Sequence, residues 1–352
     1  MTVAEELQAT IADLVDGRRG VLAADESAGT IAKRFQAVGV DSTEEHRRSY
    51  RSLLLGTEGL GQYISGVILF EETLAQRDNS GTPLPELAAR AGMVPGIKVD
   101  KGKGPLPGAP GDMITYGLDG LAERLRGYKE QGARFAKWRE VYPVSPVNPT
   151  PLGLTANAEM LARYAAVCQS CGVVPIVEPE VLMDGNQGIE RSAQVNEQVW
   201  ETVFHALHRH GVVLEYILLK PSMVTPGSEC AKAPPQQVAE YTLRSLCRAV
   251  PAAVPSINFL SGGQGPEEAT ANLNALNQLW QAPWQLSFSY GRALQQPVLH
   301  CWAGDDSRAT LAQAALRKRA RLNHLAMLGE YSEGLESMEA GDLPGGDAGG
   351  AD

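Results

Sequence analysis

The chain of 352 residues has no long uninterrupted run of apolar side chains. None approaches the ~18 residues that a membrane-spanning helix requires, so no membrane partner is expected. Basic residues are also outnumbered, because 31 Lys and Arg stand against 41 Asp and Glu, a formal net charge of −10. A general nucleic-acid binder needs a basic face for the phosphate backbone, and this balance argues against that class. A small anionic substrate is still possible, since it is bound by local charges.

The first 17 residues contain no lysine or arginine and therefore do not resemble a secretory or transit signal. Leu7, Ile11 and Leu14 fit one face of a helix instead. The five cysteines are scattered and odd in number, which is typical of free thiols in a reducing compartment. A cytoplasmic location is expected.

Apolar, β-favouring runs recur along the chain, and segments with helical periodicity follow them. Strands alternating with helices predict a parallel sheet with right-handed crossovers. Eight such units fit an α/β protein with a closed (β/α)₈ TIM barrel. An open doubly wound sheet would usually carry a dinucleotide fingerprint after its first strand, and residues 25–29 read Asp-Glu-Ser-Ala-Gly. The predicted strands are 20–24, 65–70, 95–99, 134–138, 173–177, 217–220, 254–260 and 286–290.

The end of the chain differs in composition from the rest. No lysine or arginine follows Arg321, and residues 334–352 are rich in glycine and acidic residues. Such a segment cannot bury enough apolar surface to offset its loss of entropy on ordering. We expect a barrel domain over residues 1–330 and a mobile tail over residues 331–352.

A lysine ends the sixth predicted strand, directly before Pro221. Side chains alternate along a strand, so Lys220 shares a face with Leu218 and is expected to point into the core. A buried ammonium must find an anion or lose its proton, and a neutral lysine is a nucleophile. A lysine that extends from the strand end into solvent is the alternative.

Other predicted strands also end in charged residues. The C-terminal ends of barrel strands are where catalytic groups lie, and neighbouring strands would bring Lys137, Glu178 and Lys220 together. A buried structural salt-bridge network would look the same in sequence. The charged strand ends besides Lys220 are Asp25, Lys98 and Asp100, Lys137 and Arg139, and Glu178 and Glu180.

Glycines follow the last two predicted strands, in Ser261-Gly262-Gly263 and in Gly291-Arg292. Backbone N–H groups near a helix start, together with an arginine, form an anion site, and this is the usual phosphate position in such a barrel. A nucleophilic amine beside a phosphate site indicates Schiff-base chemistry on a phosphorylated ketone. The iminium would draw electrons from the neighbouring C–C bond.

Seven blocks of the sequence resemble class I fructose-1,6-bisphosphate aldolases, in order and up to about Arg321. The resemblance implies a metal-independent lyase of glycolysis that cleaves fructose 1,6-bisphosphate reversibly to dihydroxyacetone phosphate and glyceraldehyde 3-phosphate. It further implies a homotetramer without a cofactor, and the same chemistry would accept sedoheptulose 1,7-bisphosphate. The matching blocks are 22–27, 96–102, 135–139, 177–180, 218–221, 259–263 and 288–294.

The resemblance also implies roles for the matching residues. Lys220 would form the Schiff base, Glu178 would move protons with help from Lys137, and Asp25 would take the proton of the C4 hydroxyl. The phosphate nearer the imine would be held by Ser261, Gly262, Gly263, Gly291 and Arg292. The far phosphate would be held by Ser27, Thr30, Lys98 and Arg34, with Arg139 and Glu180 as further substrate contacts.

Two stretches depart from the family pattern. Animal members end in a tyrosine that assists proton transfer, whereas this chain ends in Gly350-Ala351-Asp352 and has its last tyrosine at Tyr331. The resemblance therefore does not imply a mechanism that uses a terminal tyrosine. Residues 142–154, which include four prolines, also depart from the pattern.

Other hypotheses remain open from the sequence. A transaldolase-like Schiff-base transferase would need only one phosphate site, and a degenerate barrel could be a non-catalytic scaffold. Cys168 and Cys171, or His205, His208 and His210, could suggest zinc. Neither group has the further ligands that complete a zinc set, so no metal is predicted.

Overall fold

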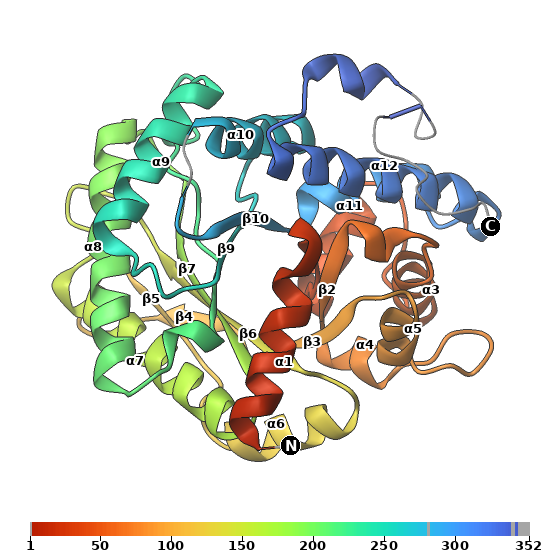
Figure 1. Ribbon diagram of the computed structural model, residues 1–352, viewed down its shortest axis with the longest axis horizontal. Coiled ribbons are helices and arrows are strands. Elements are labelled where there is room, and N and C mark those ends of the chain that lie inside the picture. Colours follow the sequence, from red (N-terminus) through yellow and green to blue (C-terminus); the bar gives the residue numbers. More distant parts are fainter. Residues whose placement is uncertain (1, 280–281, 339–341, 344–352) are drawn as a thin grey trace.

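Eight parallel strands close into a barrel in the computed structural model, which describes residues 2–279, 282–338 and 342–343 (Figure 1). Each strand pairs with its neighbour in chain order, and β10 pairs with β1 to close the ring. The predicted (β/α)₈ fold class is confirmed. The strands are β1 (Gly20–Ala24), β2 (Ile64–Leu69), β3 (Val94–Lys98), β6 (Phe135–Tyr142), β7 (Val174–Val181), β8 (Leu218–Leu219), β9 (Ser256–Phe259) and β10 (Gln285–Tyr290).

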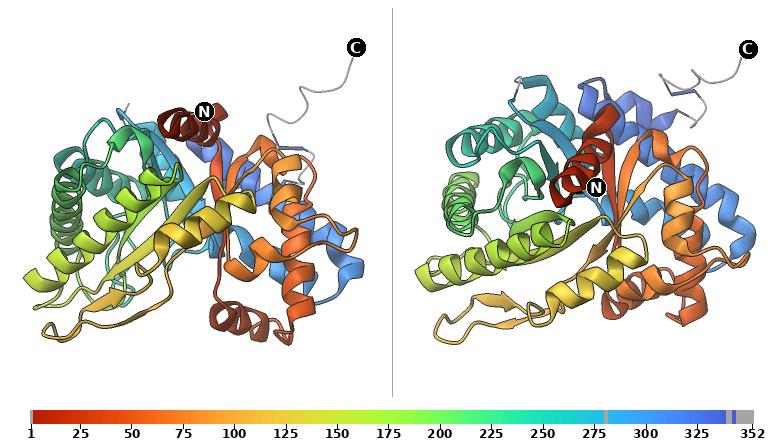
Figure 2. Two further views of the ribbon diagram at one scale, coloured as in Figure 1. Left: turned by 90° about the horizontal axis from the view of Figure 1, so that it is seen from below. Right: turned by 60° about the horizontal axis from the view of Figure 1, so that its bottom comes forward.

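Helices cover the outside of the barrel (Figures 1 and 2). They include three stretches with helical periodicity of apolar side chains, at residues 159–170, 195–207 and 267–279. A two-stranded hairpin of β4 (Lys103–Pro105) and β5 (Met113–Thr115) follows β3. The helices are α1 (Val3–Val15), α2 (Ala28–Gln36), α3 (Glu44–Leu55), α4 (Glu71–Ala75), α5 (Leu84–Arg90), α6 (Leu121–Glu130), α7 (Pro151–Ser170), α8 (Ile189–Arg209), α9 (Pro235–Ala249), α10 (Pro266–Leu279), α11 (Arg292–Trp302) and α12 (Ala309–Leu328).

The N-terminal helix α1 closes the end of the barrel at which the strands begin (Figure 2). Its apolar face, formed by Leu7, Ile11 and Leu14, packs with Val94 and Phe135 in the barrel interior. With this end filled by apolar side chains, the opposite end, where the strands finish, is the one available for chemistry.

The short strand β8 positions Lys220. Leu218 belongs to the cluster of side chains inside the barrel, so Lys220, two residues further on, points the same way. The backbone N–H of Lys220 still donates to the carbonyl of Val177, at 2.8 Å. Pro221 then has no N–H to donate, and the strand ends there.

Part of the expected tail packs against the barrel. The side chains of Tyr331 and Leu343 are buried, and Arg319 of α12 forms an ion pair with Glu336 at 2.6 Å. Residues 339–341 and 344–352 lie outside the described residues. The division of the chain at residue 330 stays a prediction, but side chains beyond it contribute to the core. Among the described helices, none has both the length and the apolar character to cross a membrane.

Candidate active site

A cleft of about 860 Å³ opens where the barrel strands end. All the residues predicted for the site line it except Gly263, which lines an adjoining cavity of about 410 Å³ together with Ser261, Gly262 and Arg292. Predicted residues from seven of the eight strand ends thus meet in one place, and Phe70 and Glu71 at the end of β2 line the same cleft. The predicted residues that line the cleft are Asp25, Ser27, Thr30, Arg34, Lys98, Lys137, Arg139, Glu178, Glu180, Lys220, Ser261, Gly262, Gly291 and Arg292.

Three buried charges, Lys137, Glu178 and Lys220, form a chain of contacts with the partly exposed Asp25 at the centre of the cleft. The carboxylate of Glu178 lies between two lysines, with Oε1 3.0 Å from Nζ of Lys220 and Oε2 3.0 Å from Nζ of Lys137. Nζ of Lys137 also lies 2.7 Å from Oδ2 of Asp25. Buried charges are tolerated when they are paired, and here two cations face two anions.

The protonation states follow from these contacts. Burial alone raises the pKa of Asp25 and of Glu178, but the ammonium groups of Lys137 and Lys220 outweigh it, and both carboxyl pKa values are lowered. Burial alone lowers the pKa of Lys137, but the carboxylates of Asp25 and Glu178 outweigh it and the pKa is raised. At neutral pH, Asp25 and Glu178 are therefore ionised and Lys137 is a cation.

An anion cradle lies beside these charges, in the loops after β9 and β10. Gly262 has a φ of +53°, a conformation that favours glycine, and its carbonyl accepts a hydrogen bond from Nη2 of Arg292 at 2.6 Å. Arg292 is the first residue of α11, directly after Gly291. A guanidinium and the free N–H groups of a helix start point to an anionic ligand here.

The second group of predicted phosphate contacts lies at the start of α2 and the end of β3. Ser27 precedes α2, and its hydroxyl lies 3.1 Å from that of Thr30. The two cations of this group already have partners, since Lys98 is paired with Asp100 and Arg34 with Glu26. A bound anion here must compete with those carboxylates.

Some residues of the cleft have features that the sequence did not reveal. Ser289 of β10 lines the cleft and is buried, and its hydroxyl has no hydrogen-bond partner in the described part of the chain. Its place at a strand end was visible in the sequence, but its unpaired hydroxyl was not. Arg139 and Glu180, predicted as separate substrate contacts, are paired with each other.

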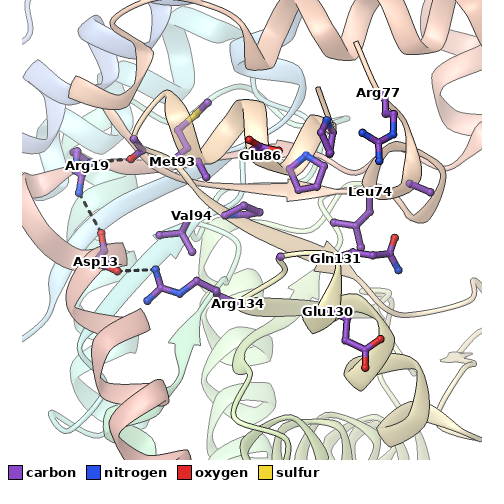
Figure 3. Close-up of a pocket in the computed structure, with 17 residues that line it drawn as sticks. Asp13, Arg19, Leu74, Arg77, Glu86, Met93, Val94, Glu130, Gln131 and Arg134 are labelled. Atoms are coloured by element: carbon purple, nitrogen blue, oxygen red, sulfur yellow. Dashed lines mark hydrogen bonds and ion pairs between the residues drawn. The ribbon is translucent and has the colours of Figure 1, made fainter. Parts of the chain in front are cut away.

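A second large cleft, of about 810 Å³, lies near the other end of the barrel (Figure 3). Three of its charged groups are engaged with each other, because Asp13 accepts from Arg134 at 2.7 Å through its carboxylate and from Arg19 at 3.2 Å through its carbonyl. No lysine is among the described residues that line it. This cleft therefore has no nucleophile for the predicted chemistry.

The residues considered for zinc do not come together. Over residues 2–279, 282–338 and 342–343, no group of three or more His, Cys, Asp or Glu side chains could hold a metal ion. Cys168 is fully buried in α7, and His210 is paired with Glu159 at 2.9 Å.

Comparison with known proteins gives one consistent family. The family model described as "Fructose-bisphosphate aldolase class-I" matches residues 6–343. Fructose-bisphosphate aldolase 1 of Toxoplasma gondii is 52% identical over 335 residues, covering 94% of this chain and 92% of the relative. The cytoplasmic isozyme of Spinacia oleracea is 50% identical over 340 residues, covering 96% and 95%. A solved structure of the aldolase from Plasmodium falciparum, in complex with TRAP and a small-molecule inhibitor, superposes with a TM-score of 0.92 at 51% identity and covers 94% of this chain and 96% of its own.

Proposed function

The chain belongs to the class I fructose-bisphosphate aldolase family, and on this basis we propose which of its residues carry out each step. The protein is a lyase that cleaves fructose 1,6-bisphosphate, as predicted, and the transferase and scaffold hypotheses are not favoured. One observation carries the assignment of roles: a single buried carboxylate, Glu178, contacts both Lys220 and Lys137.

The first step is the attack of the Lys220 amine on the C2 carbonyl of the substrate. Glu178 lies 3.0 Å from Nζ of Lys220 and is ionised, so it can accept a proton from the amine. That proton comes from the ammonium form of Lys220, so that the neutral amine attacks C2. A second proton then passes from the attached nitrogen to the C2 oxygen and gives the carbinolamine. Glu178 returns its proton to the carbinolamine hydroxyl, which leaves as water, and the iminium forms. Lys137 stays a cation beside Glu178 and stabilises the oxygen on which negative charge develops.

The second step is cleavage of the C3–C4 bond. Asp25 takes the proton of the C4 hydroxyl, the electrons of the C3–C4 bond move into the iminium, and glyceraldehyde 3-phosphate leaves as the aldehyde. Asp25 suits this role because it is ionised and lines the same cleft as Lys220. Protonation of the enamine at C3 and hydrolysis of the imine then release dihydroxyacetone phosphate.

Two groups of residues hold the two phosphates in this proposal. Both groups line one cleft except for Gly263, and they contribute the cations Arg292, Lys98 and Arg34 to it, although the chain as a whole carries a formal charge of −10. The phosphate next to the imine is held by Ser261, Gly262, Gly263, Gly291 and Arg292. The far phosphate is held by Ser27, Thr30, Lys98 and Arg34, and Arg139 and Glu180 contact the sugar.

Borohydride trapping tests these assignments. The protein is incubated with dihydroxyacetone phosphate and excess EDTA, reduced, digested and mapped by mass spectrometry. We expect a stable adduct on Lys220, and cleavage activity that survives the chelator. An adduct on Lys137 or another lysine would keep the reaction class but overturn the site. Activity lost to EDTA would overturn the imine mechanism itself.

We further propose a cytoplasmic homotetramer that also cleaves sedoheptulose 1,7-bisphosphate. The location is supported by the relatives from Spinacia oleracea and Arabidopsis thaliana that are named cytoplasmic or cytosolic isozymes. The tetramer rests on family resemblance, and sedimentation equilibrium at several protein concentrations tests it. The second substrate rests on the shared imine chemistry, and the ratio of the two kcat/KM values tests it.

A further inference from the structure

A methionine side chain contacts one of the backbone N–H donors of the proposed phosphate cradle, which is the anion cradle formed by Ser261, Gly262, Gly263, Gly291 and Arg292. The N–H of Gly263, in the loop after β9, points at Sδ of Met183, 2.9 Å away. The contact is close enough that a Cβ placed at position 263 would lie 2.1 Å from that sulfur and would require the Met183 side chain to move. Met183 lines the same cavity as Ser261, Gly262 and Arg292.

This contact pairs a good hydrogen-bond donor with a poor acceptor. A thioether sulfur is a weak hydrogen-bond acceptor, whereas an ionised oxygen makes shorter and stronger bonds with N–H donors. The N–H of Gly263 is thus satisfied by a poor acceptor. A phosphate oxygen that approaches this N–H must displace the sulfur, and it makes the stronger bond when it does.

Backbone hydrogen bonds hold the chain on both sides of the Met183 side chain. The carbonyl of Met183 accepts from the N–H of Ser228 at 2.6 Å, and the N–H of Leu182 donates to Tyr142 at 2.9 Å. A methionine side chain has three rotatable bonds and repacks readily. The sulfur can therefore leave Gly263 by rotation, without a rearrangement of the loop between β7 and α8.

We propose that Met183 is an oxidation-sensitive gate on the phosphate cradle. The proposal rests on the assignment of Ser261, Gly262 and Gly263 to phosphate binding. As the thioether, the Met183 sulfur is displaced from the N–H of Gly263 by a phosphate oxygen. As the sulfoxide, it presents an oxygen that accepts a hydrogen bond far better than sulfur, holds the N–H of Gly263, and weakens the binding of phosphate.

The modification requires a peroxide. The sulfur of Met183 attacks one peroxide oxygen, the O–O bond breaks, and for hydrogen peroxide the other oxygen leaves as water after taking up a proton. The sulfur loses two electrons and the peroxide gains them. Methionine sulfoxide reductase reverses the change.

Accessibility favours Met183 over the methionines of the core. Its side chain is partly exposed, whereas Met93, Met223 and Met327 are buried. Met160 of α7 is also partly exposed and does not line the cleft or the cavity beside it. It is therefore a matched control for oxidation without an effect on the cradle.

The test measures competitive inhibition by inorganic phosphate before and after limited treatment with hydrogen peroxide, with oxidised sites mapped by mass spectrometry. The proteins are the wild type, Met183→Leu, Met160→Leu and Arg292→Ala. A hydrogen bond contributes a factor of about 2–10 in affinity, so Met183→Leu is expected to lower the inhibition constant for phosphate by up to that factor. Oxidation is expected to raise the constant about 2–10-fold in the wild type and in Met160→Leu, with no effect in Met183→Leu. The reductase should restore it.

The possible outcomes distinguish a failure of the Met183 proposal from a failure of the phosphate-site assignment. If Met183 is oxidised in full and the inhibition constant stays the same, the gate is overturned. Equal inhibition constants for unoxidised wild type and Met183→Leu would also overturn it. If Arg292→Ala leaves phosphate inhibition unchanged, the assignment of the cradle itself fails, and the gate fails with it.

Discussion

One carboxylate oxygen of Glu178 lies 3.0 Å from the ammonium nitrogen of Lys220. This contact couples the candidate nucleophile to a group that can accept its proton. The other oxygen of Glu178 faces Lys137 at the same distance, 3.0 Å, and the charge of Lys137 keeps the carboxylate ionised. The roles of the neighbouring residues can therefore be separated by the step that each substitution slows.

Glu178→Gln keeps the size of the side chain but removes the proton acceptor. We expect formation of the Schiff base to slow and kcat to fall by about 10²–10⁴-fold, the usual contribution of a general acid–base group. The rate of the borohydride-trapped adduct with dihydroxyacetone phosphate measures the effect. Glu159→Gln, at an exposed ion pair with Arg209, is the control. Adduct formation at the wild-type rate in Glu178→Gln would rule out the proposed role.

Asp25→Asn is expected to act at a later step. The amide cannot take the proton of the C4 hydroxyl, so cleavage should fall by about 10²–10⁴-fold while the Schiff base still forms. Borohydride should then trap an intact six-carbon adduct on Lys220 when fructose 1,6-bisphosphate is the substrate. Equal losses of adduct and of cleavage would contradict a role for Asp25 in bond breaking alone.

Lys98→Ala is expected to weaken binding of the far phosphate only. A hydrogen bond to a charged group contributes about 1.5–3 kcal/mol, so kcat/KM for fructose 1,6-bisphosphate should fall by about 10–150-fold. Fructose 1-phosphate lacks the far phosphate, and its kcat/KM should change little. Steady-state kinetics with both substrates provides the comparison. An equal loss with both would show that Lys98 acts on the chemistry and not on that phosphate.

Glu140 predicts a pH dependence of stability that is independent of the active site. It is buried on the outer face of β6, where it accepts from Trp138 Nε1 at 2.8 Å and from the N–H of Thr115 at 3.1 Å. Burial outweighs these two donors and raises its pKa from 4.5 to about 8. The folded chain therefore holds this proton more tightly than the unfolded chain does.

The sign of the effect follows by linkage. The stabilisation is fully present below pH 4.5 and is lost as the pH rises towards about 8. In this window Glu140 lowers the free energy of unfolding by up to about 1.4 kcal/mol per pH unit. Urea unfolding between pH 5 and pH 9 should show a shallower slope in Glu140→Gln. Glu123→Gln, at an exposed position of α6, should match the wild type, and an unchanged slope in Glu140→Gln would refute the prediction.

Gly96→Ala tests the packing of the barrel interior. A Cβ at position 96 would lie 2.3 Å from the ring of Phe135, which is fully buried. Overpacking of this kind usually costs about 1–3 kcal/mol of stability. Gly127→Ala in α6 is the control, because nothing lies within 4 Å of a Cβ there, and it should be neutral or stabilising. Urea unfolding measures both, and Phe135→Leu should recover part of the loss in the Gly96→Ala background.

Much of the fold and of the site follows from local patterns in the sequence. Alternation along a strand requires Lys220 to face the same way as Leu218, and the order of strands and helices places Lys220 at the mouth of a closed barrel. Backbone geometry fixes these relationships wherever the strands lie. For that reason the eight strands, the inward residues of β6 and β7, and the glycine loops after β9 and β10 could be predicted.

Closure of the barrel and the conformation of individual side chains decided which residues of the site contact each other. Asp25 contacts Lys137 although β1 and β6 are not neighbours in the sheet, because the two side chains meet across the mouth of the ring. Met183 covers Gly263 because the loops after β7 and β9 come together there. Such contacts depend on tilt, side-chain rotamer and long-range packing. The sequence alone therefore determined which residues face the active site, and only the tertiary structure decided which of them touch.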